Sequence, residues 1–149
     1  GQEADLRAGT LPTPLIMGFA AAVQEAMADR DERHTRLAGL RDQLWNGLND
    51  QLPAVERNGA AAPRLAHNLN ITLPGMSGSR LHRSLRPHLA CSSGSACSNG
   101  APSHVLQALG RSRADAEASL RLSLGRGTTP AEIEQAIATI VEAVAAQQS

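Results

Sequence analysis

Apolar residues recur at helical spacing over the first third of the chain. Between residues 15 and 27 they return at four-residue steps, and Thr13-Pro14 supplies an N-cap residue followed by a first helical residue. A second run carries leucines at three- and four-residue steps, at Leu37, Leu40, Leu44 and Leu48. The pattern predicts one long helix, or a bent pair of helices, over about residues 13–52.

Two later stretches alternate apolar and polar residues, which is typical of strands with one buried face. The first is "LAHNLNITLPG" (65–75), which ends at Pro74-Gly75. The second is "ASLRLSLG" (118–125), in which the leucines share one face while Arg121 and Ser123 occupy the other. We interpret "PHLACSS" (87–93) as a third, short strand.

Three further helices are predicted from their ends. Residues 77–86 form a short helix stopped by Pro87, and residues 103–109 form another with Gly110 as the residue after its cap. A capping box at 129–132 opens the last helix, whose apolar stripe is Ile133, Ile137, Ile140, Val141 and Val144. The expected fold class is α/β of an α+β-like kind, with a small, mainly antiparallel sheet covered by helices.

Composition restricts the partners. At 149 residues and 42% hydrophobic content the chain has the size of one ordinary domain with its own core. Phe19 and Trp45 are its only aromatic residues, so a base-stacking nucleic-acid surface is not expected. The longest apolar stretch, near residues 15–23, is too short for a membrane span, and no basic-then-apolar leader precedes it. We expect a soluble, cytoplasmic protein.

Charge is distributed unevenly although 14 acidic residues balance 14 basic ones. Residues 51–126 contain nine arginines but only three acids, an excess that suits carboxylate or phosphate ligands. We interpret the helically spaced Arg80, Arg83 and Arg86 as solvated surface instead. Every basic residue is arginine, so this chain cannot anchor pyridoxal phosphate as a lysine Schiff base.

Both cysteines lie in one loop rich in small residues, which could serve a disulfide, a metal site or a single reactive thiol. The five residues between Cys91 and Cys97 do not match a zinc-binding pair, and a disulfide across so short a loop gains little in a reducing cytosol. A single reactive thiol remains. The flanking sequence "SSGSACSNG" favours Cys97 for this role, whereas Cys91, after Leu89-Ala90, fits a small buried apolar residue.

Three motifs in order resemble one enzyme family. The stretch "SSGSACSNGAPSHVLQALG" (92–110) resembles the active-cysteine loop of group I cysteine desulfurases, the NifS/IscS-like branch of the class V aminotransferase family. The stretches "GQEADLRAGTLPTPLIMGFAAAV" (1–23) and "LRLSLGRGTTPAEIEQAI" (120–137) resemble that family's Gly-rich and C-terminal signatures. The resemblance implies a fold-type I pyridoxal-phosphate enzyme of which residues 1–149 are the small C-terminal domain. The helix at about 13–52 would connect the domains, and the large cofactor-binding domain with its lysine would lie outside this chain.

The resemblance also implies a reaction and its residues. Cys97 matches the cysteine whose thiolate takes sulfur from cofactor-bound L-cysteine as a persulfide, with release of L-alanine. Arg121 matches the arginine that binds the substrate carboxylate, and Thr10 matches the threonine that reaches the cofactor phosphate of a neighbouring subunit. The implied partners are a second subunit and a sulfur acceptor such as an iron-sulfur scaffold, with no nucleic acid or membrane. The pattern assigns no role to His104.

The sequence departs from the family pattern in one respect, and two alternatives to the desulfurase function are considered. The loop after Cys97 is about two residues shorter than the commonest group I pattern, which we expect to restrict the reach of the thiol. A selenocysteine lyase or another class V C–S lyase would share the fold without depending on Cys97. The second alternative is that the isolated chain acts as a dimerisation or persulfide-accepting module without catalysis of its own.

Overall fold

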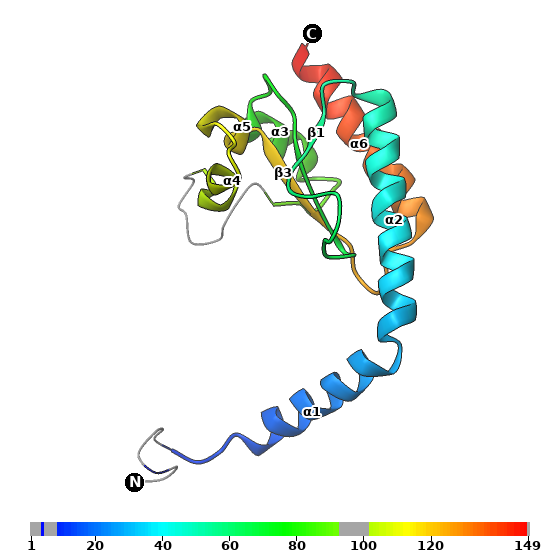
Figure 1. Ribbon diagram of the computed structural model, residues 1–149, viewed down its shortest axis with the longest axis vertical. Coiled ribbons are helices and arrows are strands. Elements are labelled where there is room, and N and C mark those ends of the chain that lie inside the picture. The colour runs from blue at the N-terminus through cyan, green and yellow to red at the C-terminus, as the bar shows by residue number, and fades with distance from the viewer. Residues whose placement is uncertain (1–3, 5–8, 93–101, 149) are drawn as a thin grey trace. The chain divides into compact units, whose positions relative to one another are not determined.

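The computed structural model describes residues 4, 9–92 and 102–148. The chain divides into two compact units, residues 1–33 and 34–149, and the division falls within the helix α2, which spans Arg30–Gln51 (Figure 1). The helical pattern predicted for residues 13–52 is thus realised as two helices, α1 and α2, separated at Asp29. The assignment of residues 1–149 to a single C-terminal domain stays a prediction.

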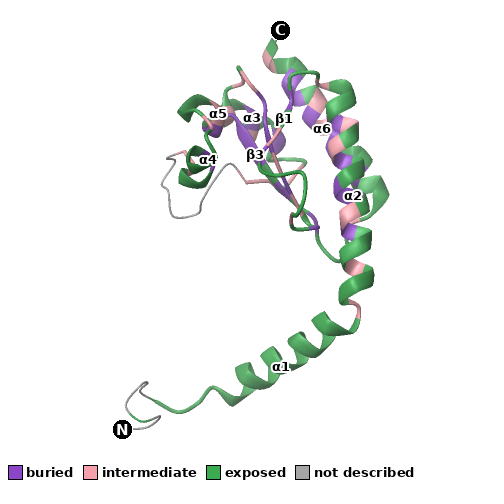
Figure 2. Ribbon diagram, in the orientation of Figure 1, coloured by how far each residue is buried: buried purple, intermediate pink, exposed green. Residues whose placement is uncertain are grey.

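The described part of the first unit is built on α1, Thr13–Ala28. Its start differs from the prediction by one residue: Pro12 occupies the cap position and Thr13 is already helical. The reason is that the N–H groups of Leu15 and Ile16 both donate to the Pro12 carbonyl, which closes the first turn one residue early. No residue of α1 is buried, as Figure 2 shows. Its exposed apolar side chains are Leu15, Ile16, Met17, Phe19, Val23 and Met27.

The second unit contains a three-stranded antiparallel sheet in the order β1-β2-β3. Its strands are β1 (Glu56–Arg57), β2 (Asn68–Thr72) and β3 (Ser119–Ser123). The predicted alternation is confirmed, because one face carries only buried apolar residues of β2 and β3, namely Leu69, Ile71, Leu120 and Leu122. The strand β1 was not predicted, since it lies in the turn-rich stretch 53–64.

Helices cover the apolar face of the sheet. The leucines of α2 and the isoleucines of α6 (Pro130–Gln148) join α3 (Gly78–Leu85) in one core with β2 and β3. The capping box is confirmed at α6: the Thr129 N–H donates to Glu132 Oε2 at 2.8 Å, and the Glu132 N–H donates to Thr129 Oγ1 at 3.3 Å. The predicted fold class, a small antiparallel sheet covered by helices, is therefore confirmed.

Two short helices follow the cysteine-containing loop. The first, α4 (His104–Ala108), begins at the Ser103 cap and ends before Gly110, whose φ of +87° confirms it as the residue beyond the cap. The second, α5 (Arg113–Glu117), was not predicted; the Ser112 side chain caps it by accepting from the Asp115 N–H. Among the described residues, no helix has the length and apolar character that crossing a membrane requires.

Candidate functional site

Arg121 lies at the centre of the polar face of the sheet. It is the middle residue of β3, and its exposed side chain projects opposite to the buried Leu120 and Leu122. Within the described part of the chain, its guanidinium has no carboxylate partner. An unpaired guanidinium on a strand offers a bidentate donor fork to a carboxylate or phosphate group.

Asn70 of β2 is the residue directly opposite Arg121. Both backbone polar groups of Arg121 bond to Ser92 on its other side, while the Asn70 carbonyl accepts from the Asn58 N–H at 2.9 Å. Asn70 and Arg121 are therefore a non-hydrogen-bonded antiparallel pair, the kind in which Cα atoms lie about 4.5 Å apart and the side chains are closest. The pairing brings together two polar side chains that are 51 positions apart in the chain.

Ser92 forms the other neighbour of Arg121. The Arg121 N–H donates to the Ser92 carbonyl at 2.7 Å, and the Ser92 N–H donates back to the Arg121 carbonyl at 3.1 Å. The short strand predicted at 87–93 is thus realised as this single bridge. The bridge holds Ser92, the last described residue before 93–101, beside Arg121. Cys97 lies outside the described residues.

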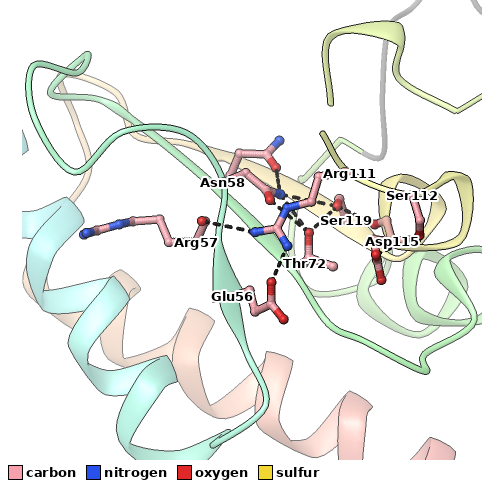
Figure 3. A network of polar contacts seen from close by, with 9 residues as sticks. Glu56, Arg57, Asn58, Thr72, Arg111, Ser112, Asp115 and Ser119 are labelled. Carbon is pink, nitrogen blue, oxygen red and sulfur yellow. Dashed lines mark hydrogen bonds and ion pairs between the residues drawn. The ribbon is translucent and has the colours of Figure 1, made fainter. Parts of the chain in front are cut away.

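A buried polar cluster is formed by Asn58, Thr72 and Ser119 (Figure 3), and Asn58 links it to Asn70. The Asn58 side-chain amide donates to Asn70 Oδ1 at 2.6 Å and to Thr72 Oγ1 at 2.9 Å. Thr72 and Ser119 share a hydrogen bond of 2.8 Å, and the Ser119 hydroxyl donates to the Asp115 carbonyl at 2.7 Å. Buried polar groups satisfied in this way specify a unique register, because a shifted strand leaves them without partners.

Arg111 connects this end of the sheet to the segment between α4 and α5. Its guanidinium forms an ion pair with Glu56 and also donates to the Arg57 carbonyl at 3.4 Å (Figure 3). Both acceptors belong to β1. The contact places Arg111 in a structural role, whereas Arg121 has no carboxylate partner among the described residues.

Cys91 and His82 lie together beside the core. The Cys91 Sγ is 3.8 Å from His82 Nδ1, and burial raises the pKa of the thiol while it lowers the pKa of the imidazole. Both shifts favour the neutral forms, so Cys91 is a poor nucleophile. The pair lines a pocket of about 560 Å³ that also includes Arg83 and Arg86. The half-buried Cys91 packs against the core, as predicted for a small apolar residue.

Thr10, which has a predicted role, and His104, to which the sequence assigns none, are both among the described residues. Thr10 is exposed in the first unit, three residues before α1. His104 is the first residue of α4 and is exposed. The roles predicted for Thr10, Cys97 and Arg121 are not tested by these positions.

Comparison with known proteins gives the family. The family model for aminotransferase class-V matches residues 1–136. The chain belongs to the class-V aminotransferase family. The "Cysteine desulfurase IscS" of Shewanella piezotolerans and that of Tolumonas auensis are each 42% identical to it over 97% of this chain. The chain spans 36% of the length of these relatives.

Solved structures agree with this membership. A NifS-like protein from Rickettsia africae matches with a TM-score of 0.85 and 26% identity, covering 97% of this chain and 38% of that one. DndA from Streptomyces lividans matches with a TM-score of 0.60 and 32% identity over 83% of this chain and 34% of its own. The resemblance to NifS/IscS-like proteins inferred from three motifs is thereby confirmed, together with the fold-type I architecture.

Asn58 and Asn70 were not identified from the sequence. A signal for Asn70 was present, because the alternation in "NLNIT" places Asn70 and Thr72 on the polar face of β2. What the sequence lacks is the register that sets Asn70 opposite Arg121. Asn58 lies just after a strand of two residues, which is too short to recognise by periodicity.

Proposed function

We propose that this chain is the carboxylate-binding and sulfur-accepting part of a cysteine desulfurase. The reaction takes the sulfur of L-cysteine onto Cys97 as a persulfide and releases L-alanine, for iron-sulfur cluster assembly or thiolation. The observation that carries the proposal is Arg121 on β3, which has no carboxylate partner among the described residues and is bridged through its backbone to Ser92, before the cysteine-containing stretch 93–101. Substrate-binding and sulfur-accepting groups would thus belong to neighbouring segments.

Arg121 would bind the α-carboxylate of L-cysteine. The guanidinium has no acidic partner within the described residues, and its planar fork can present parallel donors to both carboxylate oxygens. Its backbone bonds to Ser92 on one side, and its neighbours Leu120 and Leu122 pair with Ile71 and Leu69 of β2 on the other. A clamp on a rigid strand fixes the position of the substrate sulfur relative to the attacking thiol.

Cys97 would be the acceptor of the sulfur atom. Five residues separate it from Cys91, which packs against the core and whose pKa is raised by burial. Of the two thiols in the chain, Cys97 is therefore the one left for nucleophilic chemistry. As a thiolate it would attack the substrate sulfur, whose bond to the β-carbon breaks as the new sulfur–sulfur bond forms.

Pyridoxal phosphate, which the family implies, is not matched by a complete site in this chain. The chain contains no lysine for the covalent attachment. Thr10 alone is proposed to contact the cofactor phosphate, from a neighbouring subunit of a homodimer. The cofactor would supply the electron withdrawal that labilises the substrate bond, and residues outside this chain would hold it.

The cellular setting follows from the chemistry proposed. A persulfide must be passed on, so we propose a sulfur-accepting protein such as an iron-sulfur scaffold as partner. A nucleophilic cysteine must stay a free thiol between turnovers, and reducing conditions keep it so, which supports a cytoplasmic location. No contact with nucleic acid or membrane is proposed.

The test is a set of three substitutions in the full-length protein supplied with pyridoxal phosphate. Cys97→Ala is expected to abolish both alanine and persulfide formation from L-cysteine, whereas Cys91→Ala is expected to retain both. Arg121→Gln is expected to raise the KM for L-cysteine by at least about tenfold, because a charge-assisted contact is lost. Undiminished alanine production by Cys97→Ala would instead identify a lyase that does not use this thiol.

A further inference from the structure

The cross-strand neighbour of Arg121 carries a second donor for the same ligand. We propose that Asn70 is a further substrate-binding residue, whose side-chain amide donates to the carboxylate held by Arg121. The inference deepens the proposed desulfurase function and rests on it. It follows from the register of β2 and β3 and from the hydrogen bonds of Asn58.

The register places the two side chains side by side. Asn70 pairs with Arg121 without backbone hydrogen bonds between them, since the Asn70 carbonyl accepts from Asn58 and Arg121 bonds to Ser92. Side chains in such pairs emerge on the same face and are nearest neighbours. The Asn70 side chain is half-buried and that of Arg121 is exposed, so both reach the polar face of the sheet.

Asn58 determines which end of the Asn70 amide is available. The Asn58 Nδ2 donates to Asn70 Oδ1 at 2.6 Å, which occupies the acceptor end of the Asn70 side chain. The Asn70 Nδ2 group, with its two N–H donors, is therefore the end left for a ligand. An anion beside Arg121 needs donors, and this orientation supplies them.

The orientation of Asn58 is itself fixed. Its side chain is 4% exposed, and Thr72 Oγ1 contacts both its Nδ2 and its Oδ1, at 2.9 and 3.1 Å. The Asn58 Nδ2 also donates to Ser119 Oγ at 3.4 Å, and the Ser119 hydroxyl gives its own hydrogen to the Asp115 carbonyl. Reversing the Asn58 amide would direct its oxygen at a Ser119 oxygen that has no hydrogen left to donate, at the cost of an unsatisfied buried group. The buried cluster thus maintains Asn70 as a donor before substrate arrives, which is the preorganisation that binding sites use.

A carboxylate can use both residues together. Its two oxygens offer about four acceptor positions, of which an arginine fork takes two, and a neighbouring amide can take a third. The pair would therefore select substrates with an α-carboxylate over amines that lack one. Cysteamine, which has the thiol and amine of cysteine without the carboxylate, is the matched probe.

The experiment compares Asn70→Asp with wild type and with Asn68→Ala in the full-length protein loaded with pyridoxal phosphate. Asn70→Asp keeps an oxygen for Asn58 to donate to but replaces the ligand-facing donors with a carboxylate oxygen. Asn68 lies on the same strand and the same face, two residues away and opposite Ser123, so it controls for general effects on β2. The measured quantities are the KM for L-cysteine and the inhibition constant of cysteamine.

Asn70→Asp is expected to raise the KM for L-cysteine by about tenfold or more while changing the cysteamine constant little. Asn68→Ala is expected to change neither. Equal weakening of both ligands, or no weakening of either, would show that Asn70 has no role toward the carboxylate. These outcomes leave the desulfurase proposal intact, which fails separately if the wild-type protein forms no alanine from L-cysteine.

Discussion

Gly78, the first residue of α3, allows a sharp test of how the helices pack around the sheet. A Cβ atom built on Gly78 would lie 1.8 Å from the Glu117 carbonyl oxygen and 2.8 Å from the Glu117 carbonyl carbon. Both obstacles are backbone atoms at the end of α5. Gly78→Ala therefore forces one backbone segment to move, since neither atom can rotate away.

The size of the effect follows from the distance. Real Cβ contacts are essentially never below 3.0 Å, so the two segments must separate by about 1.2 Å. Overpacking of this kind costs about 1–3 kcal/mol, sometimes more. The displaced residues adjoin Ala118, whose carbonyl accepts from the Leu73 N–H, and Ser119 of the buried cluster. The strain would therefore reach the register of β2 and β3.

The assay is urea unfolding followed by circular dichroism. For an m-value of about 1–3 kcal/mol/M, Gly78→Ala should lower the midpoint by roughly 1 M. Gly39→Ala is the matched control, because Gly39 lies within α2 and nothing occupies the space around its Cβ position. There alanine should raise stability by about 1 kcal/mol through helix propensity alone. Equal midpoints for Gly78→Ala and wild type would refute the close packing of α3 against α5.

Three further predictions concern buried groups and helix ends. Because burial raises the pKa of the Cys91 thiol, iodoacetamide at neutral pH should modify Cys91 more slowly in the folded than in the unfolded protein, and equal rates would contradict its burial. Burial lowers the pKa of His82, so the unfolded chain takes up a proton on this imidazole at a higher pH than the folded chain does. Stability should therefore decrease as pH falls through about 6.5, and His82→Gln should flatten the dependence of the urea midpoint on pH. Thr129→Ala removes the capping box of α6 and should cost about 1 kcal/mol in the same assay, whereas Thr139→Ala, within α6, should cost much less.

Periodicity predicted the elements with strong patterns and their buried faces. The four leucines of α2, the alternating leucines of β3 and the capping box of α6 all have the positions expected of them. Their patterns are local, so the residues that specify each element lie within it. The same local reasoning placed Arg121 on the polar face of its strand.

The missed features depend on contacts between distant segments. The two-residue strand β1 exists because its backbone pairs with β2, and α5 has 5 residues, too few for a helical repeat to be recognised in the sequence. The exposure of every residue of α1 could not be inferred from its apolar spacing, which normally indicates a buried face. The pairing of Asn70 with Arg121 is set by strand register, which no single strand encodes.

The central claim is that Cys97 accepts sulfur from L-cysteine. The most direct measurement is intact and peptide mass analysis of the full-length protein after incubation with L-cysteine and pyridoxal phosphate, alongside Cys97→Ala and Cys91→Ala. An added mass of about 32 Da on the peptide containing Cys97, in wild type and Cys91→Ala, is the predicted result. An unmodified Cys97 in a protein that still forms alanine, or undiminished alanine formation by Cys97→Ala, would contradict the account.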